Sequence, residues 1–93
     1  MEEVEVTYKS TAELFEAAID MRKLTFVNGV ATWGVRGGAR HALQWFVRGA
    51  PGSSYTLRIT RPKEATFEHS AILDLDMKDA GLHWFSVAVE AEV

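Results

Sequence analysis

Cysteine is absent from this sequence of 93 residues. Its absence excludes disulfide bonds, thiolate metal ligands and cysteine nucleophiles, so a metal or catalytic site would have to use other side chains. A chain without cysteine is compatible with a reducing compartment. We therefore expect a cytoplasmic protein.

Long apolar runs are absent too. No run approaches the roughly 18 residues that a membrane-spanning helix needs. The first three residues, Met1-Glu2-Glu3, include two acids where a secretory signal would carry basic residues. We expect a soluble chain that does not associate with membranes.

Proline is scarce, with two residues, and the composition is otherwise that of an ordinary globular domain, with 47% hydrophobic and 25% charged residues. A chain of this length suits one hydrophobic core, and it contains no internal repeat or low-complexity segment. We predict a single domain over residues 1–93.

Apolar and polar residues alternate along most of the chain, as they do in β-strands with one buried face. Residues 40–48 show this most clearly. The side chains that we expect to face the core there are Leu43, Trp45 and Val47, and the outward ones are Gln44, Phe46 and Arg48. The loop 49–54 separates this run from a second one at 55–61. We predict that the two runs pair as antiparallel neighbours.

A hairpin is predicted at residues 23–33. Its centre is Asn28-Gly29, because a type I′ turn needs positive φ at both central residues and this pair tolerates it best. Alternation also predicts strands at 3–9, 67–76 and 82–93, with turns at 34–39, 61–64 and 77–81. The sequence thus predicts six to eight short strands.

Residues 10–21 fit two patterns. Ser10 followed by Glu13 resembles a capping box, and good helix formers follow, so we expect a short helix over 11–18. Yet Phe15, Ala17 and Ile19 also alternate with polar or small residues, as they would in a strand. Both patterns suit a mainly β fold, and we predict a small antiparallel β-sandwich of the Greek-key type. The sandwich is immunoglobulin-like by architecture only, since the cysteine pair of that family is missing.

Charge is distributed unevenly. Residues 21–63 carry eight basic side chains and no acid, while residues 1–20 sum to −5 and residues 64–93 to −6, for a net charge of −3. The acidic end strands can pair with basic central strands across a sheet. Alternatively, the basic residues gather on one surface and meet an anionic partner. The net acidity makes nucleic acid an unlikely partner.

Arginine and aromatic side chains give the candidate binding surface, because both are enriched where proteins bind each other. The candidate residues are Gln44, Phe46, Arg48, Arg58 and Trp84. We predict a non-enzymatic interaction module that binds another protein or itself through this face and through an edge strand at 82–93. The alternative is a sandwich that binds a small molecule or carbohydrate with Trp84 and the loops 34–39 and 49–54.

Catalytic and metal-binding motifs are weak. Residues 74–79 hold three aspartates but lack the glycine and closing glutamate of a calcium loop. His41, His69 and His83 have no metal-ligand spacing, and the sequence does not say whether they converge. It contains no nucleophile elbow and no phosphate-binding loop. We expect no catalytic residue, no metal and no cofactor.

Overall fold

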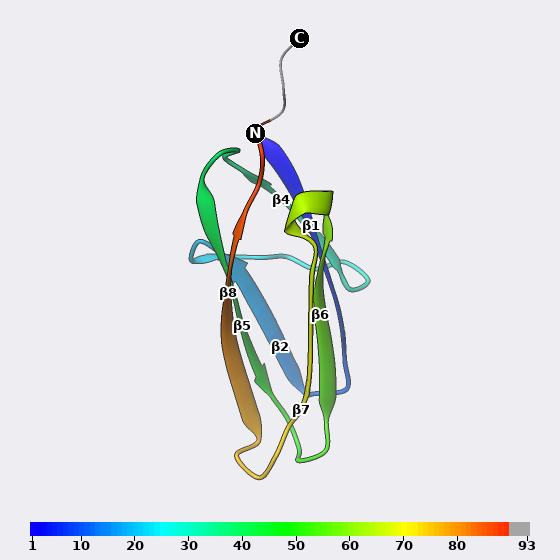
Figure 1. Cartoon of the computed structure of the whole chain (residues 1–93). Helices are drawn as coiled ribbons and strands as arrows, with labels where there is room; N and C mark the ends of the chain where they lie inside the picture. Colours follow the sequence, from blue (N-terminus) through cyan, green and yellow to red (C-terminus); the bar gives the residue numbers. More distant parts are fainter. Residues whose placement is uncertain (90–93) are drawn as a thin grey trace.

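Two antiparallel four-stranded sheets pack face to face in the computed structural model, which describes residues 1–89 (Figure 1). Sheet A has the order β4-β1-β6-β7 and consists of β1 (Glu2–Ser10), β4 (Val30–Val35), β6 (Ser54–Arg61) and β7 (Phe67–Ile72). Sheet B has the order β3-β2-β5-β8 and consists of β2 (Leu14–Ile19), β3 (Arg22–Lys23), β5 (Arg40–Arg48) and β8 (Lys78–Ser86). One 3₁₀ turn, η1 (Lys63–Ala65), follows β6. The predicted small antiparallel β-sandwich is confirmed.

The core lies between the sheets and consists of the side chains that alternation assigns to inward faces. The fully buried examples include Val4 and Val6 of β1, Leu43 and Val47 of β5, and Leu57 and Ile59 of β6. Each such side chain contributes about 1.5–3 kcal/mol by leaving water. Register is therefore fixed, since a slip by one residue would expose the whole set.

The predicted pairing of residues 40–48 with 55–61 is wrong. β5 lies between β2 and β8 in sheet B, and β6 lies between β1 and β7 in sheet A. Both strands have the expected inward faces, but they pack across the core instead of sharing a ladder. The connecting loop is long enough to cross the roughly 10 Å between packed sheets, so alternation alone did not fix the pairing.

The predicted helix over 11–18 is also wrong, because Leu14–Ile19 forms β2 and pairs with β5. As a strand, this segment turns Ala17 and Ile19 into the core and stacks Phe15 on Tyr8 with ring centroids 4.2 Å apart. A helix would point these side chains in different directions. Burial in the sandwich thus overrides the local helix preference.

The predicted hairpin at 23–33 is correct only at its tip. Asn28 and Gly29 have φ of 53° and 77°, as a type I′ turn requires, and Val27 and Val30 bond to each other in both directions. The ladder stops there. β4 instead pairs with β1 over six residue positions, and β1 is the longer partner. This segment therefore carries the chain from sheet B to sheet A.

The boundaries around the last turn differ from the prediction. β7 ends at Ile72 rather than Asp76, and Leu75 is 88% exposed instead of inward. The turn comes earlier than 77–81, because Asp74 accepts hydrogen bonds from the backbone of Asp76 and Met77. β8 consequently starts at Lys78 and ends at Ser86. Residues 90–93 of the predicted last strand lie outside the described residues.

Gly81 creates the space in which the Trp45 indole lies over β8. A β-carbon at Gly81 would overlap the six-membered ring of Trp45. Both residues face inward and are directly opposite in the β5–β8 register. Only glycine at this position leaves room for the indole.

We expect Gly81→Ala to destabilise the domain by about 1–3 kcal/mol, because the indole must leave its place between the sheets. Equilibrium unfolding in urea measures the loss. Gly34→Ala is the matched control, since its β-carbon would approach only the flexible Met1 side chain, at 3.3 Å from Sδ. Equal stability of Gly81→Ala and the unmodified protein would contradict the assigned packing.

Candidate functional site

Four of the five predicted binding residues lie on one surface. β5 and β8 place Gln44, Phe46, Arg48 and Trp84 on the outward face of sheet B, where Phe46 is 39% and Trp84 49% exposed. Arg58 is not with them. It lies in β6 on the outward face of sheet A, where its Nε donates to Glu68 of β7. The structure separates Arg58 from the rest because β5 and β6 belong to different sheets.

Two further apolar side chains belong to this surface, and sequence reasoning missed both. Leu82 lies directly opposite Gln44 and is 50% exposed, and Met21 is 83% exposed in the turn between β2 and β3. Leu82 is two residues before the outward Trp84, so alternation along the strand places both side chains on the same face. This signal was present in the sequence. We call the surface formed by Met21, Gln44, Phe46, Leu82 and Trp84 the sheet B face.

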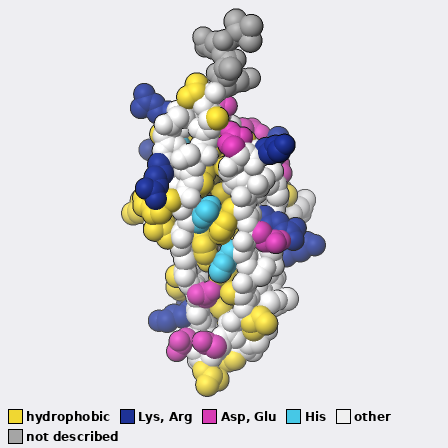
Figure 2. Space-filling model, in the orientation of Figure 1, with side chains coloured by type: hydrophobic (Ala, Val, Ile, Leu, Met, Phe, Trp, Pro, Cys, Tyr) yellow, Lys and Arg dark blue, Asp and Glu magenta, His cyan; other side chains and the backbone are white. Residues whose placement is uncertain are grey.

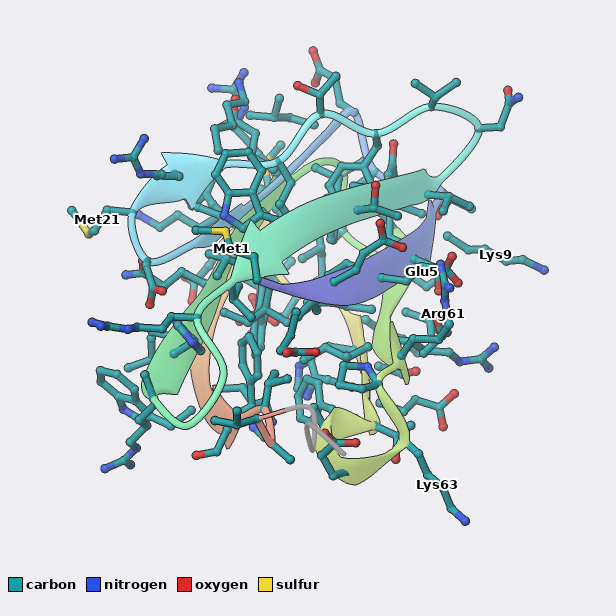
Figure 3. All side chains as sticks on the ribbon, turned by 90° about the horizontal axis from the view of Figure 1, so that it is seen from above. Met1, Glu5, Lys9, Met21, Arg61 and Lys63 are labelled. Atoms are coloured by element: carbon teal, nitrogen blue, oxygen red, sulfur yellow. The ribbon has the colours of Figure 1, made fainter. Side chains whose placement is uncertain are left out.

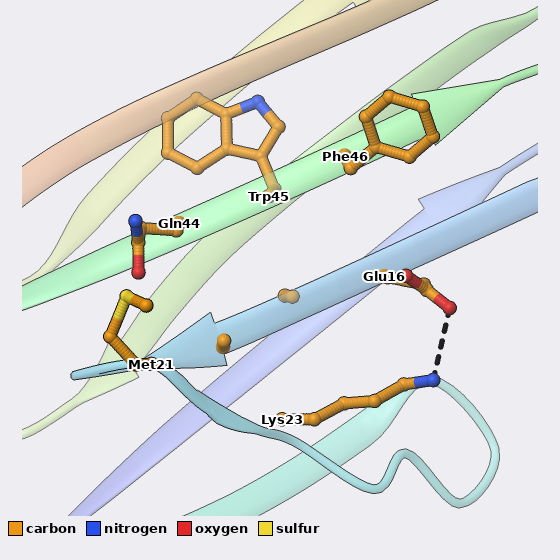
Figure 4. Close-up of a pocket in the computed structure, with 8 residues that line it drawn as sticks. Glu16, Met21, Lys23, Gln44, Trp45 and Phe46 are labelled. Carbon is orange, nitrogen blue, oxygen red and sulfur yellow. Dashed lines mark hydrogen bonds and ion pairs between the residues drawn. The ribbon is translucent and has the colours of Figure 1, made fainter.

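A shallow hollow of about 310 Å³ opens on this face (Figure 4). Met21, Gln44 and Phe46 line it, together with the small side chain of Ala18 of β2. Glu16 and Lys23 close another side with an ion pair of 2.9 Å. Because β3 is only two residues long, sheet B does not extend across this space.

Met21 reaches the hollow from a strained backbone. Asp20 and Met21 have φ of 51° and 70°, the left-handed region. Aspartate tolerates this region, but a long apolar side chain does so at a cost of about 1–2 kcal/mol. The turn is held in place because Asp20 Oδ1 accepts the backbone N–H of Ala42. Such strain, stored where a side chain is exposed, motivates a functional hypothesis for Met21.

Basic side chains lie at both ends of the sheet B face. The Arg40 guanidinium lies over the Trp84 ring, 4.7 Å from its centroid. Within residues 1–89, Arg48 and Lys78 form no ion pair. In sheet A the opposite holds, since Arg61 binds Glu3 and Glu5, and Arg58 binds Glu68. The predicted pairing of acidic end strands with basic central strands is thus confirmed for sheet A.

The backbone of β8 is exposed at the edge of sheet B. Met77 and Val87 accept hydrogen bonds from Gly49 and Gly38, which flank β5, so odd-numbered residues direct their backbone groups toward β5. The N–H groups of Ala80 and Ala88 point the other way, and Asp79 and Glu64 accept them. Within residues 1–89, the N–H and C=O groups of Leu82, Trp84 and Ser86 have no partner on this side, and they form an open stretch between the two capped positions.

The open side of the sandwich next to β8 exposes part of the core. We call the gap between β7 and β8 the seam. Figure 2 shows histidine and hydrophobic side chains there between the backbones of the two strands. Phe67 and His83 stack with centroids 3.7 Å apart, and both are half-buried. Burial lowers the pKa of His83, which favours the neutral ring.

Tyr55 joins the walls of the seam by hydrogen bonds. Trp45 Nε1 donates to its hydroxyl over 3.0 Å, and the hydroxyl donates to Asp79 over 2.5 Å. His69 Nε2 lies 3.1 Å away and must donate, because the hydroxyl proton is already used. Burial and Asp79 raise the pKa of Tyr55 to about 12. With its donor and both acceptor sites occupied, this hydroxyl is a structural group.

His41 lies apart from the other two histidines. Its Nδ1 contacts Asp20 Oδ2 at 2.6 Å, and its Nε2 contacts the Arg36 carbonyl at 2.8 Å. Both partners only accept hydrogen bonds, so both ring nitrogens donate and the ring is an imidazolium. Burial lowers its pKa, but the bonds to Arg36 and Asp20 outweigh burial and raise it. Within the described residues the three histidines do not form one metal-binding group.

The two loops proposed for a small-molecule site do not meet. The loop 34–39 precedes β5 and the loop 49–54 follows it, so they lie at opposite ends of a nine-residue strand (Figure 1). Trp84 lies on the sheet B face, opposite Ala42. These three features therefore do not form a single site.

The pair of His41 and Asp20 gives a pH-dependent stability. A raised folded-state pKa means that His41 contributes stability below its unfolded pKa of about 6.5 and loses it as pH rises through the folded value. For Asp20, burial acts against the bonds from Ala42 and His41, which lower its pKa. Its contribution is present above its unfolded pKa of about 3.9 and is lost as the pH falls.

We expect His41→Gln to lower the free energy of unfolding by about 1–3 kcal/mol at pH 6, since a charge-assisted hydrogen bond is lost. The difference from the unmodified protein should shrink as the pH rises to about 9. Urea unfolding at a series of pH values measures it. The lowered pKa of His83 also makes stability depend on pH, but it is present in both proteins and cancels in the difference between them. A difference that does not vary with pH would contradict the charged state.

We expect Met21→Gly to raise the free energy of unfolding by about 1 kcal/mol, because glycine adopts positive φ without strain. Thermal unfolding measures the gain. Asn28→Gly is the matched control, since asparagine already tolerates the left-handed region and should gain less. A loss of stability in Met21→Gly would show that the side chain contributes packing that outweighs the strain.

Comparison of the chain with protein-family models, with curated proteins and with solved structures gave no match. Within residues 1–89, no helix is long and apolar enough to cross a membrane. The basis for a functional proposal is therefore the chemistry of the sheet B face and of the β8 edge.

Proposed function

We propose that this domain is a non-enzymatic protein-interaction module that binds an extended, acidic segment of another protein as an added strand beside β8. The observation that carries the proposal is the open stretch of β8 at Leu82 and Trp84. There, backbone groups that have no partner among residues 1–89 coincide with two half-exposed apolar side chains. Strand addition uses both features, since the backbone gives affinity and the side chains give specificity.

An added strand would also cover the seam. Its inward side chains would lie beside β8 on the side of Phe67 and His83, whose rings are half-buried. Apolar residues suit these positions, because they remove the exposed part of the core from water. The seam thus favours a segment with an apolar residue at every second position.

The outward side chains of the added strand would lie next to the sheet B face. Lys78 of β8 lies at one end of the open stretch, and the neighbouring strand β5 carries Arg48 at that end and Arg40 beside Trp84. Carboxylates at the outward positions would complement these charges and speed association. The acids of sheet A, in contrast, are already paired with Arg58 and Arg61, so a second copy of this chain has fewer free carboxylates to offer. This difference favours another protein as the partner.

A cytoplasmic location stays part of the proposal. It is supported by the absence of cysteine, which is compatible with a reducing compartment.

A synthetic octapeptide that alternates valine with glutamate tests the proposal. We expect it to shift the amide resonances of Leu82 and Trp84 and to bind more weakly as salt rises. Leu82→Pro should weaken binding at least about tenfold, because it removes one outward donor and leaves the ladder to β5 intact. Leu82→Ala is the matched control, since it keeps the donor and should bind better than Leu82→Pro. The two variants are first compared with the unmodified protein by urea unfolding.

Equal binding by Leu82→Pro and Leu82→Ala would contradict strand addition. Equal binding of a valine–lysine octapeptide would contradict the acidic partner. Light scattering after gel filtration tests whether a second copy of this chain occupies the β8 edge instead. A dimer that is lost in Leu82→Pro would identify a second copy of this chain as the partner and overturn the choice of another protein.

A further inference from the structure

A second cavity lies on the other open side of the sandwich, where the short strand β3 of sheet B faces β4 of sheet A. It has a volume of about 570 Å³, within the range of small-ligand sites. Its lining includes Trp33, His41, Arg22, Arg36 and Met1. Figure 3 looks down on this end of the molecule and shows Met1 on the same side as Met21.

The cavity has an excess of positive charge. Arg22 and Arg36 are exposed and form no ion pair within the described residues. His41 adds a third charge, because both of its ring nitrogens donate hydrogen bonds. The one acid in the lining is Asp20, and each of its carboxylate oxygens already accepts a hydrogen bond, from His41 and from Ala42. Two guanidinium groups are therefore available to an anion.

Trp33 gives the cavity an aromatic wall. Trp33 is half-buried and lies two residues along β4 from each of the buried Ala31 and Val35, so its side chain lies on the face of the strand that packs on the core. Across residues 1–89 its ring stacks on no other ring and its Nε1–H has no hydrogen-bond partner. Trp45 and Trp84 differ, since Trp45 packs against Phe67 and His69, and Arg40 covers Trp84.

We propose that this cavity binds a small planar aromatic carboxylate. The aromatic ring would lie against Trp33, and the carboxylate would accept hydrogen bonds from Arg22 and Arg36, whose planar groups match its geometry. This binding site is separate from the β8 edge and goes beyond the proposed strand addition. A neutral aromatic molecule would leave the arginines unused, and an inorganic anion would leave the indole unused.

Titration with 2-naphthoate, followed by ¹H–¹⁵N correlation spectra, tests the proposal. We expect shifts of the Trp33 indole N–H and of the Arg36 and His41 amides. Arg22→Gln/Arg36→Gln should weaken binding by about tenfold or more, because two charge-assisted hydrogen bonds are lost. Lys9→Gln/Lys63→Gln is the control for the same change in net charge, since both lysines lie on the opposite side in Figure 3. The control should bind like the unmodified protein.

Each ligand comparison has a defined meaning. Binding of 2-naphthoate at least tenfold tighter than 2-naphthamide and inorganic phosphate supports the assigned ligand class. Equal affinity for phosphate would overturn the aromatic part of the proposal, and equal affinity for the amide would overturn the anionic part. Absence of any shift at Trp33, or equal weakening in the lysine control, would overturn the site. Trp33→Phe, which keeps an aromatic wall, should retain binding but lose the indole signal.

Discussion

The hydrogen bond from Trp45 to Tyr55 connects the two sheets at the centre of the sandwich. It joins β5 to β6 across the core, and Tyr55 continues it to Asp79 on β8. The indole can lie there only because Gly81 has no side chain, so β8 packs closely over it. This buried hydrogen-bond chain also positions a residue at the exposed edge of β8. Asp79, held by Tyr55 through one oxygen, caps Ala80 with the other and marks one end of the open stretch of β8.

Alternation in the sequence predicted which side chains face inward, and it did so because burial selects one face of each strand. It therefore identified the inward faces of β1, β5 and β6 and the sandwich itself. It did not predict which strands pair. Pairing depends on which sheet each strand joins, and β5 and β6 have equally apolar faces. The local preference of residues 11–18 for helix was likewise a weak signal compared with burial of Ala17 and Ile19.

The same limit explains the candidate surface. Gln44, Phe46 and Arg48 lie together because they are alternate residues of one strand, and alternate residues share a face. Arg58 was grouped with them through the wrong pairing, and its ion pair with Glu68 needs the β6–β7 ladder to be known. Leu82 was missed although alternation places it on the same face as Trp84. Met21 was missed because nothing local in the sequence predicts its positive φ.

The two carboxylates that cap β8 also limit its length as a template. An uncapped edge strand can pair with another chain along its whole length. Here Asp79 and Glu64 occupy the outward N–H groups on either side of Leu82 and Trp84. An incoming strand can pair with only a few residues of β8. Beyond them, the backbone N–H groups of Ala80 and Ala88 already donate to the Asp79 and Glu64 carboxylates. The edge can therefore pair with only a short extended segment.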